Sequence, residues 1–223
     1  MQVSQAIKER ISCRAFSSKH VSLKLIRTIL GKAARAPSGG NIQPWHLFAI
    51  TGNKLKRLLI EVTQELVSFP NGHSTEYAIY PRDLAEPYRG RRFKCGEDMY
   101  SLLNISREEK EKRKKQFAKN FKLFEAPAAI FVFIDRNMGP PQWSDVGMYL
   151  QNVFLLSKEY GLDTCAQESW AVFHALVQKH VNAPKNLMLF CGIAIGYMDI
   201  NNPINDLRTD RAPVDEIVDF IGF

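Results

Sequence analysis

The sequence predicts a single domain of mixed α and β structure. Its 223 residues suffice for one large domain with a substantial core, and 45% hydrophobic with 24% charged residues is an ordinary globular composition. Segments with helical periodicity alternate with short apolar runs that are typical of strands. Because no internal repeat or low-complexity segment divides the chain, we expect one domain over residues 1–223.

The first part of the chain follows the order helix, helix, strand, helix. Apolar residues three and four positions apart predict helices near residues 3–11 and 25–33, and Ser22 is placed to cap the second one. Residues 45–51 are typical of a strand, after which Gly52 opens another helix. Each predicted helix has one apolar face, so each is expected to pack on a core.

The later part contains two buried strands and a long helix. Residues 128–134 and 187–197 are continuous apolar runs, and residues 145–160 form a helix with so little polar surface that it needs burial on several sides. Periodicity is poor in residues 68–106, where Pro, Gly and Tyr are frequent, so we expect a lid insertion there. The tail at 214–223 is rich in large apolar residues, which predicts packing against something, for instance a second subunit.

A net charge of +7 suits an anionic partner, either a nucleic acid or a phosphorylated ligand. Much of this charge lies in residues 107–122, where Glu108 and Glu111 precede lysines by four positions, as in an exposed helix. Such a solvated helix is a simpler interpretation than a surface that reads nucleic acid. A second basic group, residues 89–94, fits either a flap over a site for negatively charged substrates or a loop with no such role.

Cysteine and histidine spacing indicates no metal site. The four cysteines form no Cys-x-x-Cys pair, and the five histidines show no zinc-type spacing beside them. No apolar stretch is long enough to span a bilayer, and the first dozen residues contain no signal core. We therefore expect a cytoplasmic protein with reduced thiols, without a metal and without a membrane segment.

The polar segment at residues 36–45 links the second helix to the first strand. Two prolines bracket a Gly-Gly pair that lets the backbone approach a ligand closely, and Ser38, Asn41 and Gln43 add donors and acceptors. This pattern fits a cradle for a flat ligand. By itself, however, it fits an ordinary helix-to-strand loop better, since Gly, Ser, Asn and Pro are the usual turn-forming residues.

Arginines beside hydroxyl groups recur near both ends of the chain. Arg10, Ser12 and Arg14 have period two, which in an extended segment points all three to one side. Paired guanidiniums suit a phosphate, and Arg208 and Arg211 repeat the theme around Thr209. Each pattern alone also fits a solvated turn.

A fourth polar cluster, residues 161–170, follows the long helix as a loop that leads into a further helix. A helix start offers free backbone N–H groups, which suit an electron-accepting ring atom. Glu168 has no partner carboxylate or histidine at a telling spacing, so we interpret it as a helix-start residue rather than a general acid or base.

Taken together and in this order, the four clusters resemble the nitroreductase family of FMN flavoproteins. The resemblance covers almost the whole chain and is greatest for bacterial nitroreductases of the nitrobenzoate reductase type, which share the Met-Gly-Pro-x-Gln-Trp run at residues 138–143. The motifs that carry it are Arg10-x-Ser12-x-Arg14, Pro37-Ser38-Gly39-Gly40-Asn41-x-Gln43-Pro44-Trp45, Gly161-Leu162-Asp163 with Gln167-Glu168, and Arg208-Thr209-x-Arg211.

The resemblance implies an α+β fold, in which helices flank a central, mostly antiparallel sheet. It also implies an intertwined homodimer, with the long helix in the dimer core and the tail at about 212–223 embracing the neighbour. The lid insertion at about 68–106 would cover the substrate.

The resemblance further implies how FMN is held. Arg10 and Arg211, with Arg208, would hold the phosphate, while Ser12, Arg14 and the backbone of Ile11 would meet the rest of the cofactor. A fixed cation at Arg14 would favour the reduced flavin, which carries negative charge. The partner subunit would contribute Pro37, Ser38, Gly39 and Asn41, and the chain's own Ala166, Gln167 and Glu168 would place a backbone N–H near the hydride-accepting atom.

The implied activity is a ping-pong reaction in which NADH or NADPH reduces FMN and the flavin then reduces a nitroaromatic or a quinone. No Gly-x-Gly-x-x-Gly motif indicates a separate dinucleotide site, and no catalytic acid or base residue is expected. Tyr77, Tyr80, Tyr88 and Phe93 are candidates to stack on a small aromatic electron acceptor, and each fits plain lid packing as well.

Other function classes remain open from the sequence. A flavin-dependent dehalogenase or a flavin-consuming enzyme of the same fold would use the same FMN site. The non-enzymatic alternatives are a flavin-storage or regulatory protein and a basic nucleic-acid-binding module, although the charge lacks a recognition element and no nucleic-acid partner is expected.

Overall fold

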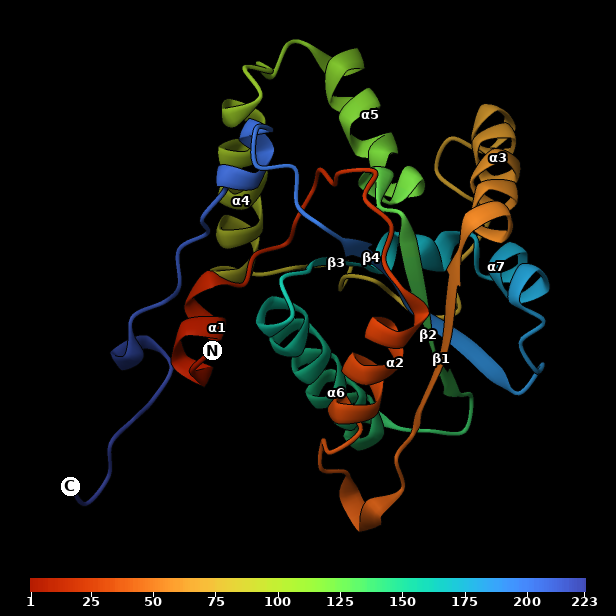
Figure 1. The fold of residues 1–223 in the computed structure, drawn as a ribbon. Helices are drawn as coiled ribbons and strands as arrows, with labels where there is room; N and C mark the ends of the chain where they lie inside the picture. The colour runs from red at the N-terminus through yellow and green to blue at the C-terminus, as the bar shows by residue number, and fades with distance from the viewer.

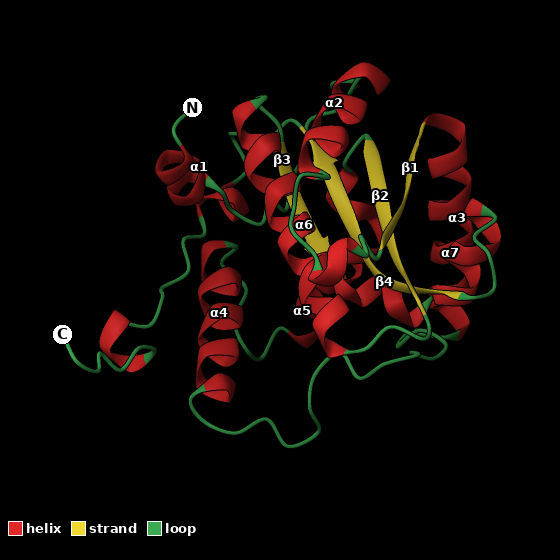
Figure 2. Cartoon of the chain, turned by 90° about the horizontal axis from the view of Figure 1, so that it is seen from below, coloured by secondary structure: helices red, strands yellow, loops and turns green.

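The computed structural model describes residues 1–223 and centres on one four-stranded antiparallel sheet. Along the sheet the strands follow the order β1-β2-β4-β3, and helices cover both faces (Figures 1 and 2). The strands are β1 (Trp45–Thr51), β2 (Ala128–Asp135), β3 (Asp163–Gln167) and β4 (Leu187–Gly196). The predicted α+β fold with an antiparallel sheet is therefore confirmed.

Seven α-helices surround the sheet. They are α1 (Val3–Glu9), α2 (Leu23–Ala33), α3 (Gly52–Ser68), α4 (Tyr88–Leu102), α5 (Lys110–Ala118), α6 (Pro140–Glu159) and α7 (His174–Val181). Helices α2 and α6 lie on one face of the sheet and α3 and α7 on the other (Figure 2). None of the helices is both long and apolar enough to cross a membrane.

Strand β2 separates two hydrophobic cores. Successive side chains of a strand point to opposite faces. Phe131 and Phe133 accordingly join the core that includes α3 and α7, while Ile130 and Val132 join the core that includes α2 and α6. Because helices cover both faces, β2 is a continuous apolar run rather than an alternating one, as the sequence indicated.

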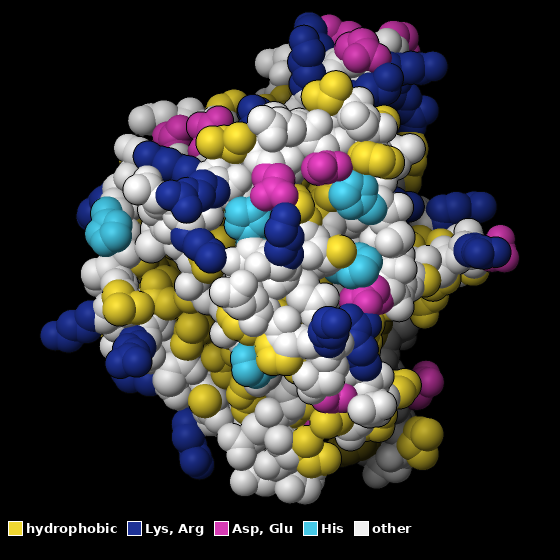
Figure 3. Space-filling model, turned by 90° about the vertical axis from the view of Figure 1, so that its right-hand side faces the viewer, with side chains coloured by type: hydrophobic (Ala, Val, Ile, Leu, Met, Phe, Trp, Pro, Cys, Tyr) yellow, Lys and Arg dark blue, Asp and Glu magenta, His cyan; other side chains and the backbone are white.

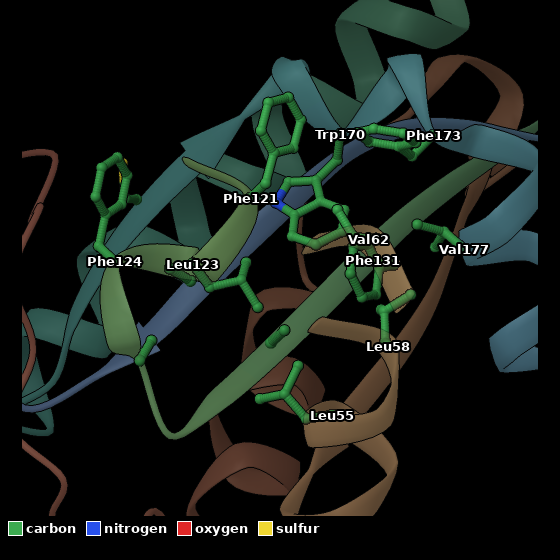
Figure 4. Close-up of a cluster of buried hydrophobic side chains, with 14 of the residues drawn as sticks. Leu55, Leu58, Val62, Phe121, Leu123, Phe124, Phe131, Trp170, Phe173 and Val177 are labelled. Atoms are coloured by element: carbon green, nitrogen blue, oxygen red, sulfur yellow. The ribbon is translucent and has the colours of Figure 1, made fainter. Parts of the chain in front are cut away.

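Trp170 is the largest fully buried side chain and fills the centre of the first core. It lies among Phe121, Phe131 and Phe173 (Figure 4), with the ring centroid of Phe131 at 5.1 Å. Gly192 of β4 makes room for the indole, because a Cβ at this position would lie only 2.7 Å from Trp170 Cδ1. Close packing against Trp170 thus requires glycine at position 192.

Helix α6 fixes the position of α2. Tyr149 donates from its hydroxyl to the carbonyl of Leu30 at 3.1 Å, and Asn152 donates to the carbonyl of Ala33 at 3.3 Å. Both carbonyls belong to the last turn of α2 and accept these bonds in addition to those from the backbone N–H groups of Ala34 and Ala36. At the other end of α2 the predicted N-cap is confirmed, since Ser22 Oγ accepts from Leu25 N at 3.2 Å.

The structure corrects four local predictions. The first helix ends at Glu9, so Ile11 lies outside it. Helix α6 begins at Pro140 instead of residue 145, because a proline is tolerated in the first turn. Residues 163–167 form strand β3 instead of a loop, because they pair with β4. In and just before α5, glutamates pair with the lysine three positions later instead of four, as Glu111 does with Lys114 at 2.8 Å and Glu109 with Lys112.

Helix α4 inside residues 68–106 was not predicted. None of its side chains is buried, so its apolar residues leave no periodic pattern in the sequence. Arg113 of α5 holds it from one side through Glu97, at 2.7 Å, and the C-terminal segment holds it from the other through Lys94 and Asp210, at 3.0 Å. A lid role for this segment stays a prediction.

Histidine and acidic side chains lie next to one another on the face formed by α3 and α7 (Figure 3). His180 of α7 contacts Glu61 of α3 at 2.5 Å, and His73 contacts Glu65 at 2.9 Å. These pairs tie α7 and the start of the 68–106 segment to α3. They lie on the opposite side of the sheet from α6.

Candidate functional site

A cavity of about 700 Å³ opens between α1, α4, α6 and the segment that leads into the C-terminal tail. It gathers five basic side chains and no acidic one, so it is suited to an anion. Its lining residues are Ile7, Lys8, Arg10, Ile11, Ser12, Arg14, Cys95, Gln151, Phe154, Leu207, Arg208, Thr209 and Arg211. Five residues predicted to hold FMN, from opposite ends of the chain, meet here together with Ile11.

Arg10 and Arg211 form the most concentrated positive charge in this cavity. Burial lowers the pKa of Arg10, and the nearby charge of Arg211 lowers that pKa further. Two guanidiniums without a carboxylate between them repel each other, and a bound phosphate offsets that repulsion. Arg211 is oriented by its own turn, since its Nη1 donates to Thr209 Oγ1 at 2.7 Å.

Asn205 organises the remaining arginines. Its Oδ1 accepts from the backbone N–H of Arg14 at 2.8 Å, and its carbonyl accepts from Arg208 Nη1 at 2.9 Å. Its Nδ2 donates to the carbonyls of Ala15 and Asp199, both at 2.9 Å. This buried amide therefore joins the N-terminal and C-terminal halves of the site.

The segment after α1 runs along β3, next to the cavity. Ser12 forms a parallel bridge with Thr164, and Cys13 N donates to the Thr164 carbonyl at 3.0 Å. Ile11 is buried, and a contact of its backbone with a cofactor stays a prediction. The turn before β3 is fixed by the enclosed ion pair of Lys158 with Asp163, at 2.9 Å.

Residues 166–168 do not line the cavity. Ala166 is exposed within β3, and Glu168 is exposed at the start of the short 3₁₀ helix η3 (Glu168–Val172), as expected of a helix-start residue. Gln167 is buried, and its Nε2 donates to the Asn120 carbonyl at 2.7 Å. The Gln167 Oε1 atom is buried without a hydrogen-bond partner, and a cofactor role for residues 166–168 stays a prediction.

The loop with Pro37, Ser38, Gly39 and Asn41 also lies away from the cavity of its own chain. In Figure 1 it is at the lower end of the molecule, beyond α2, whereas α1 and α4 are on the left. The loop is well ordered by its own contacts. Asp145 Oδ2 accepts from Gly39 N at 3.2 Å, and Ser38 Oγ accepts from Gln43 N at 2.9 Å.

The candidate aromatic residues divide into two kinds. Tyr77 is held in place, since its hydroxyl donates to the Phe190 carbonyl and its ring meets Trp143 edge-on at 5.2 Å. Burial raises the pKa of Tyr77. Tyr88 and Phe93 are 61% and 55% exposed on α4, so they remain free to contact a ligand or a partner. None of the three lines the cavity.

The sequence analysis did not identify several residues of the site. Lys8 and Cys95 line the cavity, and so do Gln151 and Phe154 from α6. A Lys or Cys in an exposed helix carries no distinguishing signal. One signal in the sequence could have indicated Asn205, namely its position shortly after Asn202-Pro203. The Asn202 side chain accepts from Ile204 N and so caps the short 3₁₀ helix η4 (Pro203–Asp206), which contains Asn205.

Comparison with known proteins gives the family. The Nitroreductase family matches residues 7–197, which include most of the cavity. The chain belongs to the nitroreductase family. It is 33% identical to the 4-nitrobenzoate reductase of Nocardioides sp. (strain LMS-CY) over 217 residues, which are 96% of this chain and 88% of that relative.

Two solved nitroreductases have the same fold. The FMN and NADPH-dependent nitroreductase NfnB from Sphigopyxis sp. strain HMH has a TM-score of 0.97 at 41% identity, over 100% of both chains. The FMN-dependent nitroreductase NfnB from Mycobacterium smegmatis, solved in complex with NADPH, has a TM-score of 0.91 at 25% identity over 98% of this chain and 99% of its own. The predicted family is confirmed.

Proposed function

We propose that this nitroreductase is an FMN-dependent NAD(P)H oxidoreductase that reduces nitroaromatic compounds. The observation that carries the proposal is the cavity in which Arg10, Ser12, Arg14, Arg208 and Arg211 converge without an acidic residue. The chain's similarity to a 4-nitrobenzoate reductase and to FMN and NADPH-dependent enzymes over almost its whole length supports it.

The residues present fit FMN. Arg10 and Arg211 would hold the phosphate, because both line a basic cavity that contains no acidic side chain. Ser12 and Arg14 lie on the strand-like segment beside β3 and would bind the remainder of the cofactor. Arg14 supplies a fixed positive charge, which favours a reduced, anionic ring.

When bound, FMN would supply the redox chemistry, namely hydride acceptance from NAD(P)H and two-electron reduction of a nitro group or a quinone in a ping-pong sequence. The protein's part is to bind, orient and exclude water. Arg10 and Arg211 would anchor the cofactor, and Asn205 keeps the Arg14 backbone and the Arg208 guanidinium in position through one hydrogen bond to each. No side chain of the cavity is placed to act as an acid–base pair, so orientation and charge carry the catalysis.

The complete site is formed in a homodimer. The Pro37–Asn41 loop cannot reach the cavity of its own chain and is contributed by the partner subunit. Exposed apolar side chains on α1 and the tail support this arrangement, among them Val3 at 69%, Ile217 at 66% and Phe223, which is fully exposed. Such surface is costly in water and marks an interface. The tail extends away from the domain (Figure 1), where it can embrace a neighbour.

Reconstitution with FMN and stopped-flow spectroscopy test the proposal. We expect a yellow protein whose flavin absorbance is bleached by NADPH or NADH and restored by 4-nitrobenzoate. A protein that binds no FMN, or one whose flavin neither nicotinamide reduces, would overturn it. Gel filtration of a variant that ends at residue 212 tests the dimer, since loss of the tail should shift the elution toward the monomer and release FMN, while an unchanged elution contradicts the embracing tail.

A further inference from the structure

A second positively charged hollow lies beside the large cavity, at the start of α4. It has a volume of about 480 Å³ and is lined by Pro81, Arg82, Asp83, Leu84, Ala85, Arg89 and Arg92. We call it the arginine cleft. None of its residues belongs to the site described above, and all three of its arginines are exposed.

Two of the three arginines have no carboxylate partner. Arg89 Nε is paired with Glu86 Oε1 at 2.8 Å, whereas Arg82 and Arg92 form no ion pair. By contrast, the basic residues on the adjacent side of α4 are already paired, Arg91 with Glu216 at 3.0 Å and Lys94 with Asp98 and Asp210. The arginine cleft is therefore the part of α4 with positive charge available to a ligand.

Arg92 is held in an orientation that suits a phosphate. Its guanidinium stacks over the Tyr80 ring, 4.1 Å from the centroid, and stacking fixes the plane of the fork. The N–H edge of a stacked guanidinium stays free for in-plane, bidentate contacts with phosphate oxygens. Tyr88, which is 61% exposed on the same face of α4, offers a ring on which a flat base can stack, whereas Arg92 already covers a face of the Tyr80 ring.

Helix α4 connects the arginine cleft to the FMN cavity. Tyr88, Arg92 and Cys95 are four and three positions apart, which places them on one face of the helix. Cys95 lines the cavity and Arg92 lines the cleft, about 5 Å apart along the helix axis at 1.5 Å per residue. A ligand that reacts in the cavity and extends along this face brings its far end to Arg92.

We propose that the arginine cleft binds the 2′-phosphate of NADPH and so selects NADPH over NADH. The inference rests on the proposed function, since it names the electron donor of that site. In dinucleotide sites an arginine accommodates the 2′-phosphate, while an acidic side chain favours the free ribose hydroxyl. Asp83 lies in the same cleft, and its negative charge opposes a phosphate, as does that of Glu86. The three guanidiniums must therefore outweigh both carboxylates.

Binding of adenosine phosphates to the FMN-loaded protein tests the cleft without turnover, because bound FMN occupies the other basic cavity. By calorimetry, 2′,5′-ADP should bind more tightly than 5′-AMP. Arg82→Ala and Arg92→Ala should each weaken 2′,5′-ADP roughly tenfold, the loss of one charge-assisted contact, and leave 5′-AMP unchanged. Asp83→Asn should act in the opposite direction. Arg57→Ala, which removes an exposed and unpaired arginine of α3, is the matched control.

Steady-state kinetics separate the two proposals. The KM for NADPH should rise roughly tenfold in Arg92→Ala while the KM for NADH stays within about twofold, since only the phosphate contact is lost. Equal effects on both donors, or 2′,5′-ADP affinities equal to those of Arg57→Ala, would overturn the phosphate assignment and leave the reductase standing. If neither donor is oxidised, the proposed function fails, and the 2′,5′-ADP measurement still decides whether the cleft binds the phosphate.

Discussion

The sheet core and the wall formed by α1, α4 and the tail differ in how much of each is buried within a single chain. Residues 128–133 of β2 are all buried between two layers of helices, whereas α4 has no buried residue over fifteen positions. The core excludes water without help. The wall carries the basic cavity, the arginine cleft and the exposed apolar tail, and the proposed function completes it with a cofactor, a substrate and a second subunit. The stable part of the molecule is thus separate from the part that binds.

The largest expected effect contrasts one aromatic residue from each region. Trp170→Ala should lower the free energy of unfolding by about 3–5 kcal/mol, because it leaves a cavity among Phe121, Phe131 and Phe173. Phe93→Ala on α4 should change it by less than about 0.5 kcal/mol, since that ring is largely exposed. Denaturant unfolding of the two apoproteins measures both. Comparable losses would show that α4 belongs to the cooperative core.

The second effect concerns the wall alone. Arg10→Ala should weaken FMN binding by about 10–100-fold, the loss of charge-assisted hydrogen bonds to a phosphate, while leaving denaturant unfolding of the apoprotein nearly unchanged. Fluorescence titration with FMN measures the affinity. Arg57→Ala on α3 is the control, with the same change of charge at a distance from the cavity. Equal affinities for the two variants would remove Arg10 from the phosphate site.

A third effect is a pH dependence at the junction of α4 and α5. The hydrogen bond from Arg113 lowers the pKa of Glu97 from 4.5 to about 2. A carboxyl group with a depressed pKa in the folded state stabilises that state above its unfolded pKa, and the contribution disappears as the pH falls from 4.5 to about 2. Urea midpoints of the wild type should therefore fall more steeply over this window than those of Glu97→Gln. Parallel slopes would contradict the role of this pair.

The smallest effect again contrasts the two regions, through thiol reactivity. Burial raises the pKa of Cys13 to about 12 and that of Cys165 to about 11, and it raises the pKa of Cys191 as well, so these thiols stay protonated near neutral pH. Cys95, half-exposed beside the cavity, should alone react rapidly with a disulfide reagent at pH of about 8. Bound FMN should slow that reaction, and all four thiols should react after denaturation. Rapid reaction of several thiols in the folded protein would show that the core opens readily.

The sequence by itself determined the elements whose side chains are buried. Strands at 45–51 and 128–134, the helices that pack on them and the Ser22 cap all followed from local patterns, because burial on one or both faces leaves a regular spacing of apolar residues. The four polar motifs were equally visible, and together they indicated the family.

Only the tertiary structure decided what lies between those elements. Helix α4 buries nothing and therefore left no period in the sequence, and β3 is a strand because β4 and the segment at Ser12 pair with it. Arg10 and Arg211 meet in one cavity because Asn205 links the two ends of the chain. Contacts between residues distant in sequence depend on the packing of the whole domain, so no local pattern in either segment specifies them.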